Sequence, residues 1–168
     1  MAHRFRGESH QKVDAKGRVS IPALFRPVIQ QSDPDWSEGK RANMVIVYGT
    51  ESQNRFNVYT IEAIEQIDRR IDRMKKGSPE RKYMERIYHG HSWPTQLDDD
   101  GRIQLTQKLR EKLGLKDSAF FIASGDHFQI WNPETYEAEE KAKTDEWLAE
   151  QDPDFDPDSL LPDLPEDA

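Results

Sequence analysis

The sequence predicts an α+β fold, mainly β with helices, built from two similar units. Three observations predict it. The stretch "VDAKGRVSIP" at residues 13–22 returns as "LDDDGRIQLT" at residues 97–106. Each copy is followed by two short segments whose apolar residues run together or alternate, as they do in β-strands. The segment between the copies instead carries apolar residues three or four positions apart, which is the spacing of one helix face.

The two units have the same order of strand-like segments. In the first unit "MVIVY" (44–48) precedes "RFNVY" (55–59), and in the second "AFFIA" (119–123) precedes "HFQIW" (127–131). Equivalent residues are 84 positions apart at the start of each unit but 72 apart at the end, so the first unit has about twelve extra residues. They fall chiefly in the loop-like stretch "SDPDWSEGKRAN". Because insertions belong in loops, this comparison supports two homologous units.

Each unit is predicted to begin as a hairpin closed by a turn of the form Asp-x-x-Gly-Arg. Asp14 and Asp98 stand where the turn starts, and a carboxylate there accepts hydrogen bonds from backbone N–H groups of its own turn. Gly17 and Gly101 stand where a positive φ is required. We therefore expect these four residues and Arg102 to have structural roles.

Helices are expected between the units and at their ends. The stretch "TIEAIEQIDRRIDRM" has a single apolar stripe, made of Ile61, Ile64, Ile67, Ile71 and Met74. The stripe predicts a helix packed on the intramolecular core, with self-association as the alternative. Further helices are predicted by caps: one from Ser78-Pro79 to about Tyr88, one between Thr106 and Gly114, and one starting at Asn132-Pro133.

Length and composition exclude several classes of protein. The chain has 168 residues, enough for one modest domain or two small ones that share a core. No apolar run approaches the roughly 20 residues that span a bilayer, and the first residues lack the apolar region of a signal peptide, so we expect a cytoplasmic protein without membrane contact. There is no Cys, which excludes disulfides and thiol catalysis.

Charge is distributed unevenly along the chain. The net charge is −8, but ten acidic residues and no Lys or Arg lie after residue 143, so residues 1–143 carry +2. The acidic segment, 145–168, is also rich in Pro and lacks a periodic apolar pattern, which predicts disorder. The first 26 residues carry a local charge of +4. The N-terminal end is therefore the basic pole of the chain.

These residues carry a resemblance to a known family. The chain resembles the MraZ family, bacterial transcriptional regulators with two SpoVT-AbrB (AbrB/MazE-like) domains. The resemblance lies in the stretch "FRGESHQKVDAKGRVSIPALFR", the two turns with Asp14–Arg18 and Asp98–Arg102, and the lead-in "YHGH". The resemblance implies swapped hairpins forming a double-split β-barrel, a ring-shaped homo-oligomer, and binding to tandem direct repeats of promoter DNA upstream of the division and cell-wall gene cluster. The expected organisation is a first repeat at 8–60, connecting helices at 61–90, a second repeat at 91–134, a C-terminal helix at 135–144 and the acidic tail at 145–168.

The two turns differ in charge, and this difference predicts the DNA-binding surface. The first has Ala15 and Lys16 where the second has Asp99 and Asp100, so the charge changes from +1 to −2. Phosphates favour the first turn. The expected DNA-binding residues are Lys16 and Arg18, supported by Arg4, Arg6 and Lys12. A guanidinium at position 18 can pair with guanine or phosphate; alternatively it closes back on Asp14 as an ion pair within the turn.

Two other stretches contain residue types found in metal or catalytic sites. His89 and His91 could form a metal pair, and "SGDH" (124–127) has the residue types of a hydrolase triad, but both stretches are more typical of loops. No cofactor motif is present, so we expect a protein that is not an enzyme and holds no metal or cofactor. The DNA binding that the resemblance implies would make it nucleoid-associated. The alternatives are a MazE-like antitoxin whose acidic tail binds a toxin, and a ring scaffold without DNA. A partner for the tail is not identified by the sequence.

Overall fold

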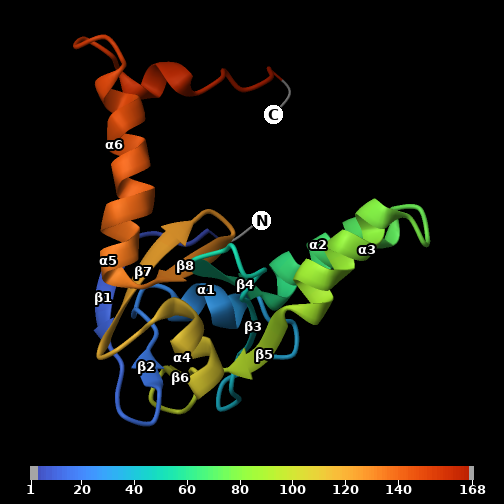
Figure 1. Ribbon diagram of the computed structural model, residues 1–168. Coiled ribbons are helices and arrows are strands. Elements are labelled where there is room, and N and C mark those ends of the chain that lie inside the picture. The colour runs from blue at the N-terminus through green and yellow to red at the C-terminus, as the bar shows by residue number, and fades with distance from the viewer. Residues whose placement is uncertain (1–3, 167–168) are drawn as a thin grey trace.

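A computed structural model describes residues 4–166 as an α+β protein, which confirms the predicted class. Figure 1 shows strands gathered into one body from which two helical arms extend, α2 and α3 on one side and α5–α6 on the other. The strands are β1 (Glu8–Lys12), β2 (Arg18–Ser20), β3 (Asn43–Val47), β4 (Arg55–Thr60), β5 (Ser92–Gln96), β6 (Arg102–Gln104), β7 (Ser118–Ser124) and β8 (His127–Trp131). The helices are α1 (Arg26–Gln31), α2 (Ile61–Asp72), α3 (Pro79–Glu85), α4 (Gln107–Leu113), α5 (Pro133–Thr135) and α6 (Ala142–Ala149), with π-helical turns η1 (Arg86–Gly90) and η2 (Tyr136–Lys141) and a 3₁₀ turn η3 (Pro157–Leu160).

The two repeats exchange strands. Six strands form one antiparallel sheet in the order β1-β7-β8-β4-β3-β5, and β2 pairs with β6 in a separate two-stranded ribbon. The first strand of each repeat therefore pairs with the third strand of the other, β1 with β7 and β5 with β3. The local hairpins predicted from the sequence are reduced to their turns: β1 and β2 meet at one bridge, between Val13 and Val19, and then separate.

The order of strands in the sheet is symmetric between the two repeats. Exchanging β1 with β5, β3 with β7 and β4 with β8 gives the same order counted from the opposite edge. The pairing registers obey the same rule. Asn57 pairs with Gln129 at the middle of the sheet, and Val19 pairs with Ile103 at the middle of the ribbon. Each pair joins equivalent residues of the two repeats, so one approximate two-fold axis relates the halves of a single chain.

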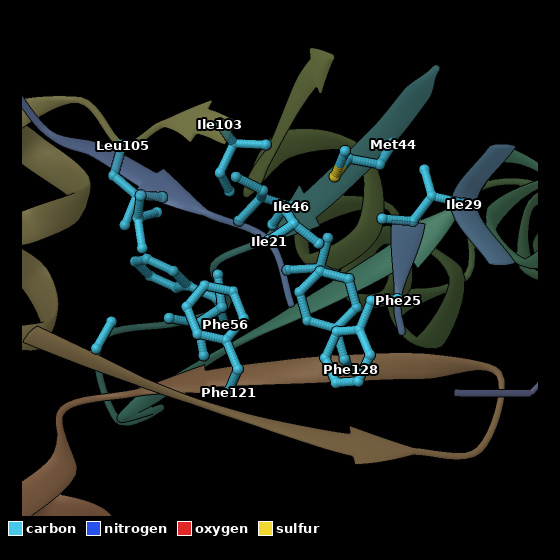
Figure 2. Packing of buried hydrophobic residues seen from close by; sticks show 14 of the residues in the cluster. Ile21, Phe25, Ile29, Met44, Ile46, Phe56, Ile103, Leu105, Phe121 and Phe128 are labelled. Atoms are coloured by element: carbon cyan, nitrogen blue, oxygen red, sulfur yellow. The ribbon is translucent and has the colours of Figure 1, made fainter. Parts of the chain in front are cut away.

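The ribbon covers one face of the sheet, and the main core lies between them. Figure 2 shows Ile21, Ile103 and Leu105 from the ribbon and its flanks above the sheet residues Phe56 and Phe128. These side chains are at most 2% exposed. Full burial of a large apolar side chain contributes about 1.5–3 kcal/mol, so this contact holds the ribbon, and the turns at its ends, in a fixed position.

The other face of the sheet packs against α2. Ala63 and Ile64 of the helix are buried with Val47 and Tyr59 of the sheet. Thr60 caps the helix by accepting a hydrogen bond from the backbone N–H of Ala63. The predicted apolar stripe is therefore mostly intramolecular core: Ile64 and Ile71 are buried and Ile67 packs against the same cluster, while Ile61 and Met74 are half-buried.

Most predicted helices are found, and one helix was missed. The caps at Ser78, Thr106, Gly114 and Asn132 are all present. Helix α1 was not predicted, because it is short and has Pro27 as its second residue. The C-terminal helical segment starts at Pro133 and continues through η2 and α6 to Ala149, five residues further than expected. Within residues 4–166, no helix is long and apolar enough to cross a bilayer.

Candidate nucleic-acid interface

The first turn, residues 14–18, is closed by Asp14. Its Oδ1 accepts hydrogen bonds from the backbone N–H groups of Lys16 (3.0 Å) and Arg18 (2.8 Å), and its Oδ2 accepts one from Arg18 Nε (2.7 Å). The backbone hydrogen bond from Arg18 is the main cause that lowers the pKa of Asp14. Gly17 takes a φ of +84°. The ion pair within the turn, which the sequence left as an alternative for Arg18, is thus formed.

The second turn, residues 98–102, repeats this geometry. Asp98 Oδ1 accepts from the backbone N–H groups of Asp100 (2.8 Å) and Arg102 (2.9 Å), and Oδ2 accepts from Arg102 Nε (3.2 Å). Burial opposes ionisation of Asp98, but the hydrogen bonds from Arg102 and Asp100 outweigh it and the pKa of Asp98 is lowered. Gly101 takes a φ of +75°.

The two turn arginines differ at their outer ends. Arg102 Nη2 donates to Asp100 Oδ2 at 3.0 Å, so this guanidinium is held by two carboxylates. The residue equivalent to Asp100 in the first turn is Lys16, which has no carboxylate. Arg18 therefore uses only Nε within the turn, and among residues 4–166 its Nη1 and Nη2 atoms have no acceptor. Arg18 presents two unoccupied donor groups on a side chain that is 39% exposed.

Each turn also receives an arginine from the other repeat. Arg110 donates from Nε to Leu105 O (3.2 Å) and lies against Gly17, where an added Cβ would be 2.8 Å from that nitrogen. Arg26 makes the equivalent hydrogen bond to Ile21 O (3.0 Å) and lies against Gly101. A side chain at either glycine would displace the arginine.

These added arginines change the charge balance of both turns. Arg41 forms an exposed pair with Asp99, Nε to Oδ1 at 3.2 Å, and this hydrogen bond raises the pKa of Arg41. With Arg26, Arg41 and Arg102 beside its three carboxylates, the second turn is formally neutral. The first turn, with Arg110 added, carries +2. The second turn is therefore less anionic than its sequence suggests, but the first remains the basic one.

The supporting residues do not all lie near the first turn. Lys12 ends β1 next to the turn, and its side chain is exposed. Arg4 and Arg6 precede β1 and lie at its opposite end, where Arg4 is close to Gly125 in the loop between β7 and β8. Eight residues of extended chain between Arg6 and Asp14 span about 26 Å. The structure thus groups Lys12 with Lys16 and Arg18, and separates Arg4 and Arg6 from them.

Sequence reasoning missed Arg110, Arg26 and Arg41 as neighbours of the turns. Arg26 and Arg110 are 84 positions apart, the same offset that relates Arg18 to Arg102. The internal repeat was therefore a signal that could have paired them. It could not show that each arginine crosses to the turn of the other repeat, because that follows from the pairing of β2 with β6.

The two stretches with residue types of a metal or hydrolase site do not form such sites in residues 4–166. His89 Nε2 lies 3.0 Å from Asp68 Oδ1, whereas His91 stacks on Tyr48 with ring centroids 5.6 Å apart. The two imidazoles therefore engage different partners. The "SGDH" stretch is the hairpin turn between β7 and β8, in which Ser124 pairs with His127.

Comparison with known proteins gives consistent matches. The family model described as "MraZ protein, putative antitoxin-like" matches residues 90–154. A protein of Ruegeria pomeroyi named "Transcriptional regulator MraZ" is 55% identical over 157 residues, 94% of each chain. Proteins of the same name are 46% identical over 146 residues in Cereibacter sphaeroides, covering 83% of this chain and 86% of the relative, and 30% identical over 148 residues in Coxiella burnetii, covering 88% and 89%.

Proposed function

Because this chain belongs to the MraZ family of transcriptional regulators, we propose that it binds double-stranded DNA in a sequence-specific manner through its first turn. Its sites are tandem direct repeats in the promoter upstream of the division and cell-wall gene cluster. It acts there as a ring-shaped homo-oligomer. The protein resides in the cytoplasm, associated with the nucleoid.

The contrast between Arg18 and Arg102 carries this proposal. Both arginines are oriented by an aspartate through Nε, but only Arg18 keeps Nη1 and Nη2 available, since Lys16 replaces the carboxylate of Asp100. A guanidinium held at its inner end, with its outer donors directed outward, suits the paired acceptors O6 and N7 of guanine or two phosphate oxygens. The ion pair with Asp14 and the DNA contact are therefore compatible: the first orients the group that makes the second.

The neighbouring cations would hold the DNA backbone. Lys16 lies within the first turn, Lys12 ends β1 beside the turn, and Arg110 lies against Gly17 of the turn. Contacts of this kind to phosphates position a protein on the duplex, and each one steepens the salt dependence of binding. Arg4 and Arg6 are too far from the turn to reach the same phosphates. We assign them to DNA that continues along β1 or reaches a neighbouring copy.

Several copies must act together, because one turn is too small for specific binding. Specific protein–DNA interfaces bury on the order of 1,000 Å² or more of protein surface. A cyclic oligomer presents the same turn repeatedly and in one direction, and this arrangement matches direct repeats better than palindromes. The two-fold axis inside the chain does not disturb this polarity, since only one of the two related turns is basic.

The proposed role requires neither catalysis nor a cofactor. The relatives are named as transcriptional regulators and not as enzymes. The two stretches with catalytic or metal-ligating residue types lie in a hairpin turn and beside other partners. We therefore propose that this chain is not an enzyme.

A footprint on the DNA upstream of the protein's own gene tests the proposal. We expect wild type to protect tandem repeats, Arg18→Ala to lose the protection, and the matched control Arg102→Ala to retain it. Both substitutions remove an Asp–Arg pair, so the control separates DNA contact from turn stability. Light scattering checks that the mass of the oligomer is unchanged. Equal footprints for wild type and Arg18→Ala would overturn the assignment. No salt-dependent DNA binding by any variant would favour the ring scaffold.

An antitoxin role is the second candidate. The matching family model includes the words "antitoxin-like", and the chain ends in an acidic segment with exposed leucines, as a toxin-binding tail would require. Against it, one chain here contains both AbrB-type repeats, which two chains of a MazE-like antitoxin would supply. The neighbouring genes distinguish the two roles: a small toxin gene favours the antitoxin, and division and cell-wall genes favour the regulator.

A further inference from the structure

A groove that the DNA-binding role does not use lies between α2, α3 and the turn joining β7 to β8. Its volume is about 490 Å³. Its apolar side chains include Ile67 and Ile71 of α2, Met74 just after this helix, and Met84 of α3. Ile71 is buried, whereas Ile67, Met74 and Met84 are half-buried and form the open apolar part of the lining. The groove is therefore an apolar surface that the described chain leaves open.

The helical segment that contributes to this groove is rich in basic residues. Residues 69–86 contain eight Lys or Arg and three Asp or Glu. Arg81 is mostly buried and bound to Asp72 and Glu85, but the other cations are exposed. Arg70 lines the groove directly. The one carboxylate in the lining, Asp126, is paired with His127 at 2.9 Å. An occupant should therefore combine apolar side chains with negative charge.

The C-terminal segment of the chain has this composition. Residues 150–166 contain seven Asp or Glu and no Lys or Arg. Within them Leu160, Leu161 and Leu164 are 59%, 70% and 84% exposed. Three leucines within five residues form a small apolar cluster in an otherwise anionic segment. Pro157, Pro162 and Pro165 oppose continued helix around the cluster, which suits insertion into a groove as an irregular segment.

We propose that residues 150–166 of one copy dock in the α2–α3 groove of a second copy. The leucine cluster enters the apolar groove and the carboxylates face the basic residues of the α2–α3 segment. The partner is a second copy because, within one chain, α6 carries the segment away from the sheet and apart from α2 and α3 (Figure 1), with its leucines exposed. The groove favours this segment over DNA, since DNA could pair with Arg70 but has no apolar side chains to fill the half-buried lining of Ile67, Met74 and Met84.

The absence of Cys in the chain allows a direct test by disulfide crosslinking. Leu161→Cys is placed in one tagged full-length chain and Met74→Cys in a chain with another tag, and the two are co-expressed so that they assemble together. Under mild oxidation we expect a mixed disulfide with a yield about tenfold above that of a control, Gln107→Cys on exposed helix α4, because docking raises the effective concentration. Adding Leu160→Ser and Leu164→Ser to the tail, or Arg70→Glu and Arg73→Glu to the groove, should return the yield to the control level.

Three results would overturn the proposal. The first is equal yields for Met74→Cys and the control. The second is a disulfide only within a chain that carries both cysteines, which would place the segment on its own groove. The third is crosslinking insensitive to Arg70→Glu and Arg73→Glu while DNA binding weakens, which would make the α2–α3 segment a nucleic-acid surface. The first two readouts do not involve DNA, and the third concerns the α2–α3 arm and not the first turn, so failure here leaves the proposed DNA contact of the first turn untouched.

Discussion

Replacing Lys16 by Asp tests the difference between the two turns most directly. Lys16 is equivalent to Asp100, whose Oδ2 accepts a hydrogen bond from Arg102 Nη2 at 3.0 Å. Lys16→Asp should recreate this contact in the first turn and occupy the outer end of Arg18. The turn itself should persist, because its backbone hydrogen bonds to Asp14 are the same as those that already coexist with an aspartate in the second turn.

The expected loss of affinity follows from the contacts removed. A bidentate arginine–guanine contact contributes about 1–3 kcal/mol, or roughly 5- to 150-fold in affinity, for each turn engaged. Loss of the lysine–phosphate contact should also lower the slope of log K against log salt by about 1 per turn. Lys16→Ala is the matched control, since it removes the lysine but leaves Arg18 unoccupied. Lys16→Ala should therefore show the lower slope of log K against log salt, but only a small part of the affinity loss expected for Lys16→Asp.

The assay is fluorescence anisotropy with the promoter repeats, titrated between about 50 and 200 mM salt. The melting temperature of each variant is measured alongside. Wild-type affinity for Lys16→Asp at every salt concentration would refute the reasoning that the outer end of Arg18 meets DNA. The reciprocal change, Asp100→Lys, frees Arg102 and should not weaken binding.

Gly17→Ala should destabilise the protein by about 1–3 kcal/mol and weaken DNA binding, because the new Cβ meets Leu105 O at a positive φ. The control Gly39→Ala is also at positive φ but in open space, so it should lower the free energy of unfolding by less in a denaturant titration. Equal losses of stability in the two variants would contradict the steric argument. The pKa of Asp14 is lowered in the folded state, so its contribution to stability is present above the ordinary carboxyl pKa near 4 and is lost as pH falls through the lower, folded value. Asp14→Asn should therefore flatten the acid limb of stability against pH, and an unchanged slope would exclude this role. Truncation after Ala149 removes eight of the ten tail carboxylates and should raise DNA affinity at low salt, as measured by anisotropy; no change at any salt concentration would show that the tail does not compete with DNA.

The local features of the fold could be predicted because short stretches determine them. Both Asp-x-x-Gly-Arg turns and the caps at Thr106, Gly114 and Asn132 follow from the chemistry of a few adjacent residues. The strands after each turn follow from apolar alternation. Helix α1 was missed because Pro27 and its short length left no periodic signal.

The partners of these elements could not be predicted from local patterns alone. The alternation around Val13 and Val19 is equally consistent with a hairpin and with strands that separate, and the resemblance to a family rather than the pattern itself implied the exchange. The same limit applies to the second turn. Its three carboxylates predicted an anionic loop, but Arg26 and Arg41 reach it from the other repeat and neutralise it. Charges computed over a stretch of sequence omit such long-range compensation.

The exchange of strands between the repeats also constrains how the protein can be made. Glu8 pairs with Ile122, so the edge strand β1 has no partner until the second repeat has left the ribosome. Strand pairings between residues so distant in the sequence form slowly, and the apolar faces of the unpaired strands stay exposed until they form. The nascent first repeat should thus depend on chaperones, or on rapid completion of synthesis, to avoid pairing with the edge strand of another unfinished chain.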